Sequence, residues 1–195
     1  LVLSDRAAGP DRLPIPSLLA CGAVHQHLIA VKARTRTGLL LEAGDPKEPH
    51  DFCTLVGYGA DGVCPYGAYA AVAAFEAVPG GDNEEALMDK YRKSAGKAML
   101  KVMSKIGIST VQSYKGAQIF EAVGLGDEVM DACFTGTASR LGGIGFDLLQ
   151  KDLLRQHDWA WPVDERADVM LPNPGDYHFR DGGEQHYNTP QAMAE

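Results

Sequence analysis

The sequence contains no long uninterrupted run of apolar residues. A helix needs about 18 such residues to cross a bilayer, and no stretch of the chain approaches that length. The chain does not open on a basic segment followed by an apolar one, and its first residue is Leu1 rather than methionine. We therefore expect no membrane span and no secretory leader, and we expect the chain to be a piece of a longer protein.

Basic residues are scarce relative to acidic ones. The 195 residues include 18 lysines and arginines against 26 aspartates and glutamates, which gives a net charge of −8. Such a balance argues against attraction to nucleic acid or to an anionic membrane surface. Hydrophobic residues make up 45% and charged residues 23%, which predicts a folded chain rather than a disordered one.

Cysteine is rare and never paired at short spacing. The four cysteines stand at positions 21, 53, 64 and 133, and none forms a C-x-x-C pair. Zinc and iron–sulfur sites take their ligands from such pairs, so we expect no metal site here. The spacing predicts four buried apolar thiols in a reducing intracellular compartment, either the cytoplasm or an organelle.

The common catalytic motifs are missing too: G-x-S-x-G, H-E-x-x-H and a phosphate-cradling G-K-S/T do not occur. Residues 57–62 do match G-x-G-x-x-G. A dinucleotide site requires a strand before this motif and a helix after it. Here the preceding residues look helical and the following ones look extended, so the motif predicts the end of a helix instead.

Histidines offer only weak metal candidates. His25 and His27 are two positions apart on a predicted helix and point about 200° apart, so they cannot share one ion. His50 lies beside Asp51 and close to Glu48, and these groups are either ligands or caps of a helix start.

A glycine-rich stretch offers one anion candidate. Arg140 with Gly142, Gly143 and Gly145 could cradle an anion. A tight turn between domains explains the same residues.

The first third of the chain alternates between extended and helical patterns. Leu39-Leu40-Leu41 is typical of a strand buried on both faces, and Ser17 is placed to cap a helix. The alternation predicts βα units and a parallel sheet. The expected elements are strand 1–3, helix 17–31, strand 37–42, helix 48–57 and strand 62–64.

A long amphipathic helix is predicted over Glu84–Ile106, after a turn at 79–83. Asp82 and Glu85 form a capping-box-like start, and Gly107 is placed to end the helix. Five apolar side chains at helical spacing are expected to pack on the sheet: Leu87, Tyr91, Ala98, Val102 and Met103. Beyond it we expect a strand or extended turn over 108–114, a helix over 117–123 ended by Gly124, and a helix over 147–157.

The run KVMSKIGIST at 101–110, continued by SYKGAQIFEA at 113–122, closely resembles the large subunit of glutamate synthase, especially its eukaryotic NADH-dependent form. Within residues 42–51 the chain departs from the family pattern, with Lys47 in place of an arginine and Asp51 in place of a histidine. Further similar stretches are 3–6, 15–29, 55–61, 134–140 and 177–183.

The resemblance implies an enzyme that moves the amide nitrogen of L-glutamine onto 2-oxoglutarate and reduces the product to give two L-glutamate. It implies that residues 1–158 are the latter part of the central domain, a partial or degenerate TIM-barrel-like α/β domain with a parallel sheet. Residues 159–195 would be an extended connector into the flavin-binding domain. The expected partners are the amidohydrolase and flavin-binding domains of the same chain.

The full enzyme of this family uses FMN, a 3Fe–4S cluster and NAD(P)H. None of the family's catalytic, cofactor-binding or metal-binding residues falls on a position of this chain. We therefore expect this piece to be a spacer and a wall of an ammonia passage, because an enclosed apolar passage keeps ammonia uncharged. The alternative is a non-catalytic α/β scaffold or binding module derived from that domain.

Four side chains are expected just past the ends of the predicted strands: Ser4, Asp5, Glu42 and Tyr66. In parallel βα folds the carboxyl ends of the strands form the functional face. We call these four residues the strand-end rim, and we expect them to cluster without acting as acid or base. The alternative is that they are turn and core residues only.

Overall fold

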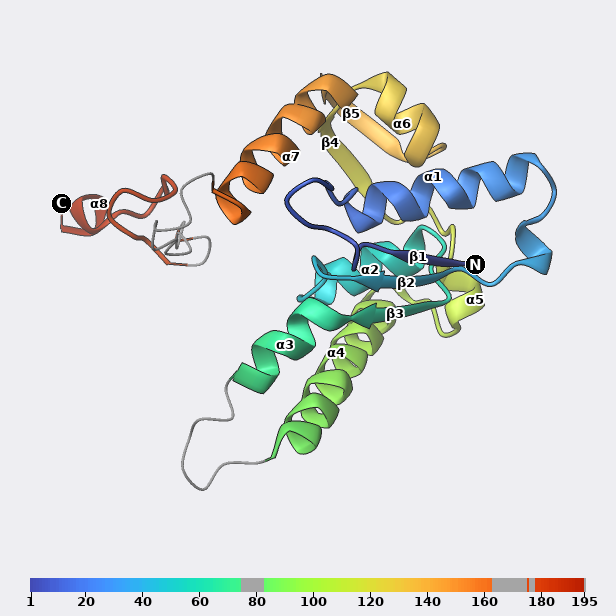
Figure 1. Cartoon of the computed structure of the whole chain (residues 1–195), viewed down its shortest axis with the longest axis horizontal. Coiled ribbons are helices and arrows are strands. Elements are labelled where there is room, and N and C mark those ends of the chain that lie inside the picture. Colours follow the sequence, from blue (N-terminus) through green and yellow to red (C-terminus); the bar gives the residue numbers. More distant parts are fainter. Residues whose placement is uncertain (75–82, 163–174, 176–177, 195) are drawn as a thin grey trace. The chain divides into compact units, whose positions relative to one another are not determined.

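The computed structural model describes residues 1–74, 83–162, 175 and 178–194. Three short parallel strands form its first sheet, in the order β1-β2-β3 (Figure 1). The register sets Ser4 beside Glu42 and Glu42 beside Cys64. The strands and their connecting helices are β1 (Val2–Ser4), α1 (Ser17–Ala30), the short 3-10 turn η1 (Arg34–Arg36), β2 (Leu40–Ala43), α2 (Pro49–Gly57) and β3 (Gly62–Pro65).

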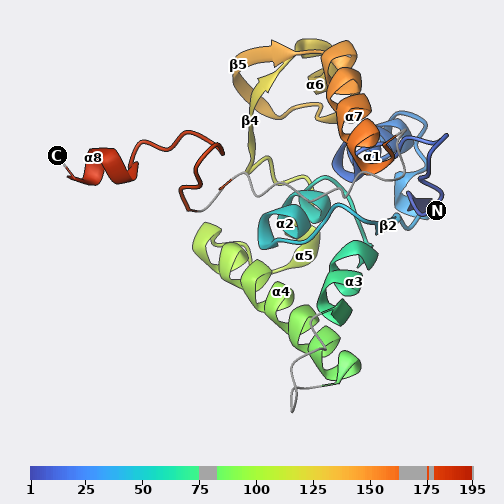
Figure 2. The same cartoon turned by 60° about the vertical axis from the view of Figure 1, so that its left-hand side comes forward.

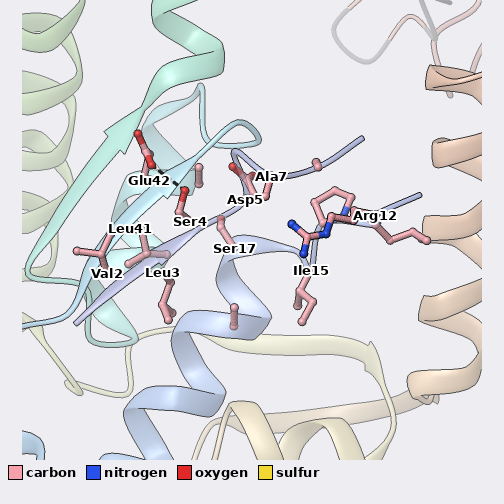
Figure 3. A pocket seen from close by; sticks show the side chains of 15 residues that line it. Val2, Leu3, Ser4, Asp5, Ala7, Arg12, Ile15, Ser17, Leu41 and Glu42 are labelled. Carbon is pink, nitrogen blue, oxygen red and sulfur yellow. Dashed lines mark hydrogen bonds between the residues drawn. The ribbon is translucent and has the colours of Figure 1, made fainter. Parts of the chain in front are cut away.

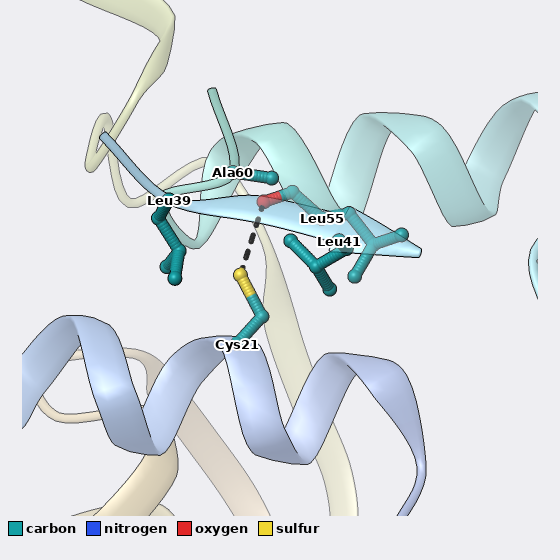
Figure 4. Packing of buried hydrophobic residues seen from close by; sticks show 5 residues of the cluster. All are labelled: Cys21, Leu39, Leu41, Leu55 and Ala60. Carbon is teal, nitrogen blue, oxygen red and sulfur yellow. Dashed lines mark hydrogen bonds between the residues drawn. The ribbon is translucent and has the colours of Figure 1, made fainter. Parts of the chain in front are cut away.

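The two faces of this sheet differ because side chains alternate along a strand. Leu41 on one face is buried in a cluster with Cys21 of α1 and Leu55 of α2 (Figure 4). On the other face Val2 and Leu40 are exposed, Leu40 by 47%. The prediction of a strand buried on both faces is therefore wrong: only alternate residues of the leucine run enter the core.

Helix α1 begins at Ser17, but Ser17 is not its cap. Pro16 occupies the capping position, and the Ser17 amide donates to Asp45 Oδ2 at 3.0 Å. A carboxylate from the loop after β2 thus supplies the cap, which the local sequence does not reveal.

Helix α4 (Glu84–Ile106) matches its predicted bounds and ends at Gly107, whose φ of 74° is the left-handed conformation that glycine adopts readily. Its start is capped by Asn83, whose side chain accepts from the Ala86 amide, and Asp82 lies outside the described residues. None of its five predicted apolar residues is exposed. They face helices rather than the sheet, because α4 packs mainly on α2 and on an unpredicted helix, α3 (Tyr66–Ala74) (Figure 2).

Two predictions between residues 108 and 123 are wrong. Residues Val111–Tyr114 form a short helix, α5, capped by Thr110, and not a strand. The segment predicted as a helix over 117–123 is irregular over 117–120 and then enters strand β4 (Glu121–Leu125), and Gly124 with a φ of 78° lies inside that strand.

The glycine-rich segment forms strand β5 (Ala138–Ile144), which pairs in parallel with β4. Helix α6 (Asp127–Cys133) connects the two strands, and its Val129 and Met130 form a second buried cluster with Cys133 and Phe134. Helix α7 (Phe146–Ala160) follows and confirms the helix predicted over 147–157.

The described residues form an α/β fold with two separate short parallel sheets and no closed barrel. The α/β class with parallel strands is confirmed, while the TIM-barrel-like form is not. Within the described part of the chain, no helix is both long and apolar enough to pass through a membrane.

The chain divides into two compact units, Leu1–Arg155 and Gln156–Glu195. The sequence predicts the division after Asp158. The described part of the second unit holds the end of α7 and a short helix, α8 (Pro190–Ala194).

Candidate functional site

The strand-end rim lies where β1, β2 and β3 end. Ser4 Oγ donates to Glu42 Oε2 at 2.7 Å, as the dashed line in Figure 3 marks. Arg6, two residues after Ser4, donates from Nε to Glu42 Oε1 at 2.5 Å. Both carboxylate oxygens of Glu42 are therefore engaged, and the bonds from Ser4 and Arg6 hold its pKa below the usual range.

Asp5 and Tyr66 complete the rim on the other side of Arg6. Asp5 Oδ2 accepts from the Gly44 amide at 2.9 Å, which fixes the turn after β2. The Arg6 guanidinium stacks over the Tyr66 ring, 4.4 Å from its centroid. Burial, followed by the nearby Asp5 carboxylate, raises the pKa of Tyr66 to about 12.

The structure thus brings all four rim residues together around Arg6. At neutral pH Glu42 is ionised and paired, and Tyr66 keeps its proton. A general acid or base works best when its pKa lies near the working pH, and the shifts of these two groups lead away from it. The arrangement is suited to fixing the ends of three strands and to presenting charge-balanced polar atoms.

Arg6 was missed as a rim residue in the sequence, although it directly follows Ser4 and Asp5. Its position just past β1 was the available signal. Its two partners come from β2 and from the start of α3, and that convergence depends on the register of the sheet.

A cavity of about 490 Å³ opens beside the rim, between the start of α1, strand β1 and the loop over residues 5–16 (Figure 3). Asp5 reaches it from the strand side and Arg12 from the loop, while Ser17 and Ala20 of α1 form one wall. Most of its remaining lining is aliphatic: Val2, Leu3, Ala7, Ala8, Leu13, Pro14, Ile15, Leu41 and Ala43.

A second polar network lies at the opposite ends of β2 and β3. Arg34 donates to Asp61 Oδ2 at 3.0 Å and to His25 Nδ1 at 2.9 Å. Lys115 pairs with the other Asp61 oxygen, and the Leu39 amide donates to Asp61 at 2.7 Å. This network joins four segments that are distant in the sequence, which is why spacing alone did not reveal it.

Each of the three candidate histidines has different surroundings. His25 Nδ1 accepts from Arg34, so its ring carries the proton on Nε2 when neutral; burial and the Arg34 charge lower its pKa. His27 is exposed, and His50 packs edge-on against Phe120, with ring centroids 5.9 Å apart. Asp51 caps α2 by accepting from the amides of residues 47 and 48, each at 2.9 Å.

The glycine motif at 57–62 follows α2 and precedes β3, the reverse of the order that a dinucleotide site needs. Gly59 has a φ of 115°, and a Cβ at this position would collide with the His25 ring. The motif is therefore a helix stop with a close backbone approach, as predicted.

Arg140 lies in β5 and holds Glu121 with two hydrogen bonds, at 2.6 and 2.7 Å. The glycines near it belong to or directly follow that strand. Neither the anion cradle nor the interdomain turn describes this segment, since its arginine already has a carboxylate partner within the sheet.

Three cysteines are buried, but Cys64 is exposed, so the prediction of four buried thiols is wrong at Cys64. Burial raises the pKa of Cys21 to about 12. Across the described ranges no cluster of three or more His, Cys, Asp or Glu could hold a metal ion. The four cysteines, three of them buried apart from one another in separate clusters, therefore do not fit the ligand set of an iron–sulfur cluster.

Comparison with known proteins gives one consistent family. The profile of the glutamate synthase central domain matches residues 1–126. The glutamate synthase (NADH) of Schizosaccharomyces pombe is 47% identical over 198 residues, covering 100% of this chain and 9% of the relative. The corresponding protein of Saccharomyces cerevisiae is 43% identical over 100% of this chain and 10% of its own length.

A bacterial relative is similar to the same extent. The glutamate synthase (NADPH) large chain of Bacillus subtilis is 43% identical over 99% of this chain and 13% of its own length. The chain thus spans about a tenth of the length of the curated relatives it matches.

Proposed function

Because the chain belongs to the glutamate synthase family, through that family's central domain, we propose that it works as one part of a glutamate synthase. That enzyme transfers the amide nitrogen of L-glutamine to 2-oxoglutarate with reduction, giving two L-glutamate. The amidohydrolase and flavin-binding domains of the same long chain are the proposed partners. They would supply the nucleophile, FMN, the 3Fe–4S cluster and the site for NAD(P)H reduction.

Within that enzyme this chain is a spacer and a wall of the passage that ammonia follows between the two active sites. The observation that supports the proposal is that the charged groups of the rim are bonded to one another. Glu42 is held by Ser4 and Arg6, and Arg6 is also stacked on Tyr66. A wall needs fixed side chains that do not exchange protons with the molecule passing it.

The proposal also has a physical reason in the chemistry of ammonia. Released into water at neutral pH, ammonia becomes mostly ammonium, which is a poor nucleophile. An enclosed path of low dielectric disfavours the charged form. A paired carboxylate such as Glu42 would attract ammonium less than a free one, which suits a wall.

The test is Glu42→Gln in the full enzyme. The amide leaves Arg6 without its ionic partner and loosens the rim, so we expect glutamate formation to fall about two- to fivefold while glutaminase turnover stays within about 20%. The ratio of the two rates, measured by product quantification, is the readout. Asp89→Asn is the matched control, because it also removes a half-buried, ion-paired carboxylate, here on α4. An unchanged ratio in Glu42→Gln would show that the rim is structural only.

A further inference from the structure

A second cavity, of about 210 Å³, is lined by α1, the end of α2 and the loops around residues 116–120 and 135–137. Its polar side chains are His25, Gln26, Tyr58, Tyr114, Gln118, Thr135 and Thr137, and its apolar side chains are Ile29, Ala117, Ile119 and Phe120. Among the described residues, no aspartate, glutamate, lysine or arginine lines it. The cavity is therefore polar without holding an ionised group of its own, because the lowered pKa of His25 keeps that ring neutral at pH 7.

Two glycines leave room for two of these polar side chains. Gly59 has a φ of 115°, and a Cβ there would collide with the His25 ring. Gly136 has a φ of 81°, and a Cβ there would lie 2.9 Å from the amide nitrogen of Gln118. Gln118 itself has a φ of 52°, a left-handed conformation that residues other than glycine adopt rarely and at a cost. The backbone thus brings an imidazole and a carboxamide into one cavity through three left-handed residues.

Most hydroxyl and carbonyl groups of the cavity already have partners. The hydroxyls of Tyr58 and Thr137 bond to each other at 2.8 Å. The hydroxyls of Tyr114 and Thr135 each donate to a backbone carbonyl, at 3.1 and 2.7 Å. The Gly57 carbonyl, in the last turn of α2, accepts from a backbone amide at 2.9 Å. A ligand therefore has to be bound by other groups of the lining.

Three nitrogen donors remain. The side-chain amides of Gln26 and Gln118 form no hydrogen bond with the described part of the chain. His25 Nδ1 accepts from Arg34 at 2.9 Å, so the neutral ring carries its proton on Nε2, which has no partner within the described ranges. His25 and Gln26 are half-buried. The free groups of the cavity are thus donors gathered from α1 and from the loop before β4.

The charges next to the cavity leave a positive excess. The charged groups that act on the His25 ring are Arg34, Lys115 and the Asp61 carboxylate that both cations share. The side chains of Arg34 and Lys115 are only 17% and 15% exposed, so water and salt screen them less than surface charges. Two cations against one carboxylate leave one positive charge unbalanced beside donors that have no partner. This field favours an anion with a single negative charge.

We propose that this second cavity binds a small aliphatic monocarboxylate. Its two oxygens accept from the Gln26 and Gln118 amides and from His25 Nε2, and its short tail lies against Ile29 and Ile119. A volume of about 210 Å³ is below the usual range of sites for drug-sized ligands, so only a small molecule fits. The site does not rest on the proposed passage function, and its failure would leave that proposal as it stands.

An NMR titration of the 195-residue chain tests the site with three probes. Butyrate carries both the charge and the tail, butyramide has nearly the same shape without the charge, and inorganic phosphate has charge without a tail. We expect butyrate to shift the side-chain amide signals of Gln26 and Gln118 until they saturate, and to bind at least tenfold more tightly than either other probe. No saturable shift with butyrate up to about 20 mM, or an affinity for butyramide or phosphate within tenfold of that for butyrate, would overturn the proposal.

Gln118→Gly removes one donor and at the same time relieves the left-handed conformation, so this variant should remain folded. We expect butyrate to bind at least fivefold more weakly, with no decrease in the midpoint of thermal unfolding. Lys32→Gly is the matched control, because Lys32, with a φ of 57°, is the other left-handed residue besides glycine in the described chain and lies outside the cavity. Gln118→Gly binding butyrate as tightly as Lys32→Gly does would contradict the proposal.

Gln26→Leu removes the second amide while keeping a side chain of similar size. It should also weaken butyrate at least fivefold, whereas Gln150→Leu, at an exposed glutamine of α7 outside the cavity, should not. Combining Gln26→Leu with Gln118→Gly should abolish the saturable shift that butyrate causes in the ring signals of His25. A double variant that still binds butyrate would place the ligand elsewhere and overturn the proposal.

Discussion

Asp61 is the side chain on which Arg34 and Lys115 converge, the two least exposed cations among the ion pairs of the described residues. Its two oxygens receive Lys115, Arg34 and the amide of Leu39, so three segments are tied to the start of β3. Burial opposes its charge, but the bonds from Lys115, Leu39 and Arg34 outweigh burial and lower the pKa of Asp61 to about 2. Its ordinary value is 3.8.

The lowered pKa of Asp61 makes the stability of the fold depend on pH in one direction. Because the pKa in the fold lies below the value in the unfolded chain, ionised Asp61 stabilises the fold above about pH 4, and this contribution is lost as pH falls toward 2. Asp61→Asn should lower the free energy of unfolding by roughly 2 kcal/mol at pH 7, since it removes two charged hydrogen bonds. The difference in the free energy of unfolding between the variant and the parent, measured by urea titration, should become smaller between pH 4 and pH 2. Asp11→Asn, at an exposed aspartate, is the control. A difference in the free energy of unfolding that stays constant between pH 4 and pH 2, or that equals the difference caused by Asp11→Asn, would contradict this account.

At the scale of elements, helices are fixed by their ends as much as by their apolar faces. The first turn of α4 has amides without intrahelical partners, and Asn83 accepts from one of them, the Ala86 amide at 2.9 Å. The first turn also carries Glu84 and Glu85, which favour the positive end of the helix.

Asn83→Ala should therefore lower the free energy of unfolding by about 1 kcal/mol. Ser94→Ala is the control, because Ser94 is exposed in the middle of the same helix and alanine is the better helix former. Urea denaturation measures both, and hydrogen exchange at the Ala86 amide reports the cap directly. A cost of Asn83→Ala no larger than that of Ser94→Ala would show that the cap contributes nothing.

Elements with strong local signals could be predicted from the sequence, and elements that depend on distant partners could not. The apolar spacing of α4 and the left-handed Gly107 are local features, and both are as predicted. Strand β4 follows Ile119 and Phe120, which suit a helix equally well, and it is extended because β5 pairs with it. The four rim residues could be predicted because each directly follows a predicted strand. Arg12 could not, because its place beside the cavity depends on how the loop over residues 5–16 folds back.

At the scale of the whole molecule, apolar burial is unevenly distributed. Every buried hydrophobic side chain of the described residues belongs to the first unit, Leu1–Arg155. The second unit has none in its described part, yet it carries both tryptophans, Trp159 and Trp161, which are 60% and 37% exposed. Within the described residues, the stability that comes from apolar burial therefore belongs to the first unit.

Two spectroscopic probes should consequently unfold at different urea concentrations. Tryptophan fluorescence follows the second unit, while circular dichroism at 222 nm follows the helices, most of which lie in the first. We expect the fluorescence midpoint to lie at least about 1 M lower than the dichroism midpoint, which is the signature of a transition that is not two-state. Coincident curves would mean that the two units unfold as one.

The register of the first sheet places Cys64 beside Glu42, with Ser4 on the far side. Cys64 is the one exposed thiol of the four, all of which lie in the described part of the chain. The protein therefore carries its own attachment point for a maleimide dye or spin label, one strand away from the rim, while the other three thiols are shielded from the reagent. Occupants and movements of that edge can be followed on the unaltered sequence, with no cysteine added or removed.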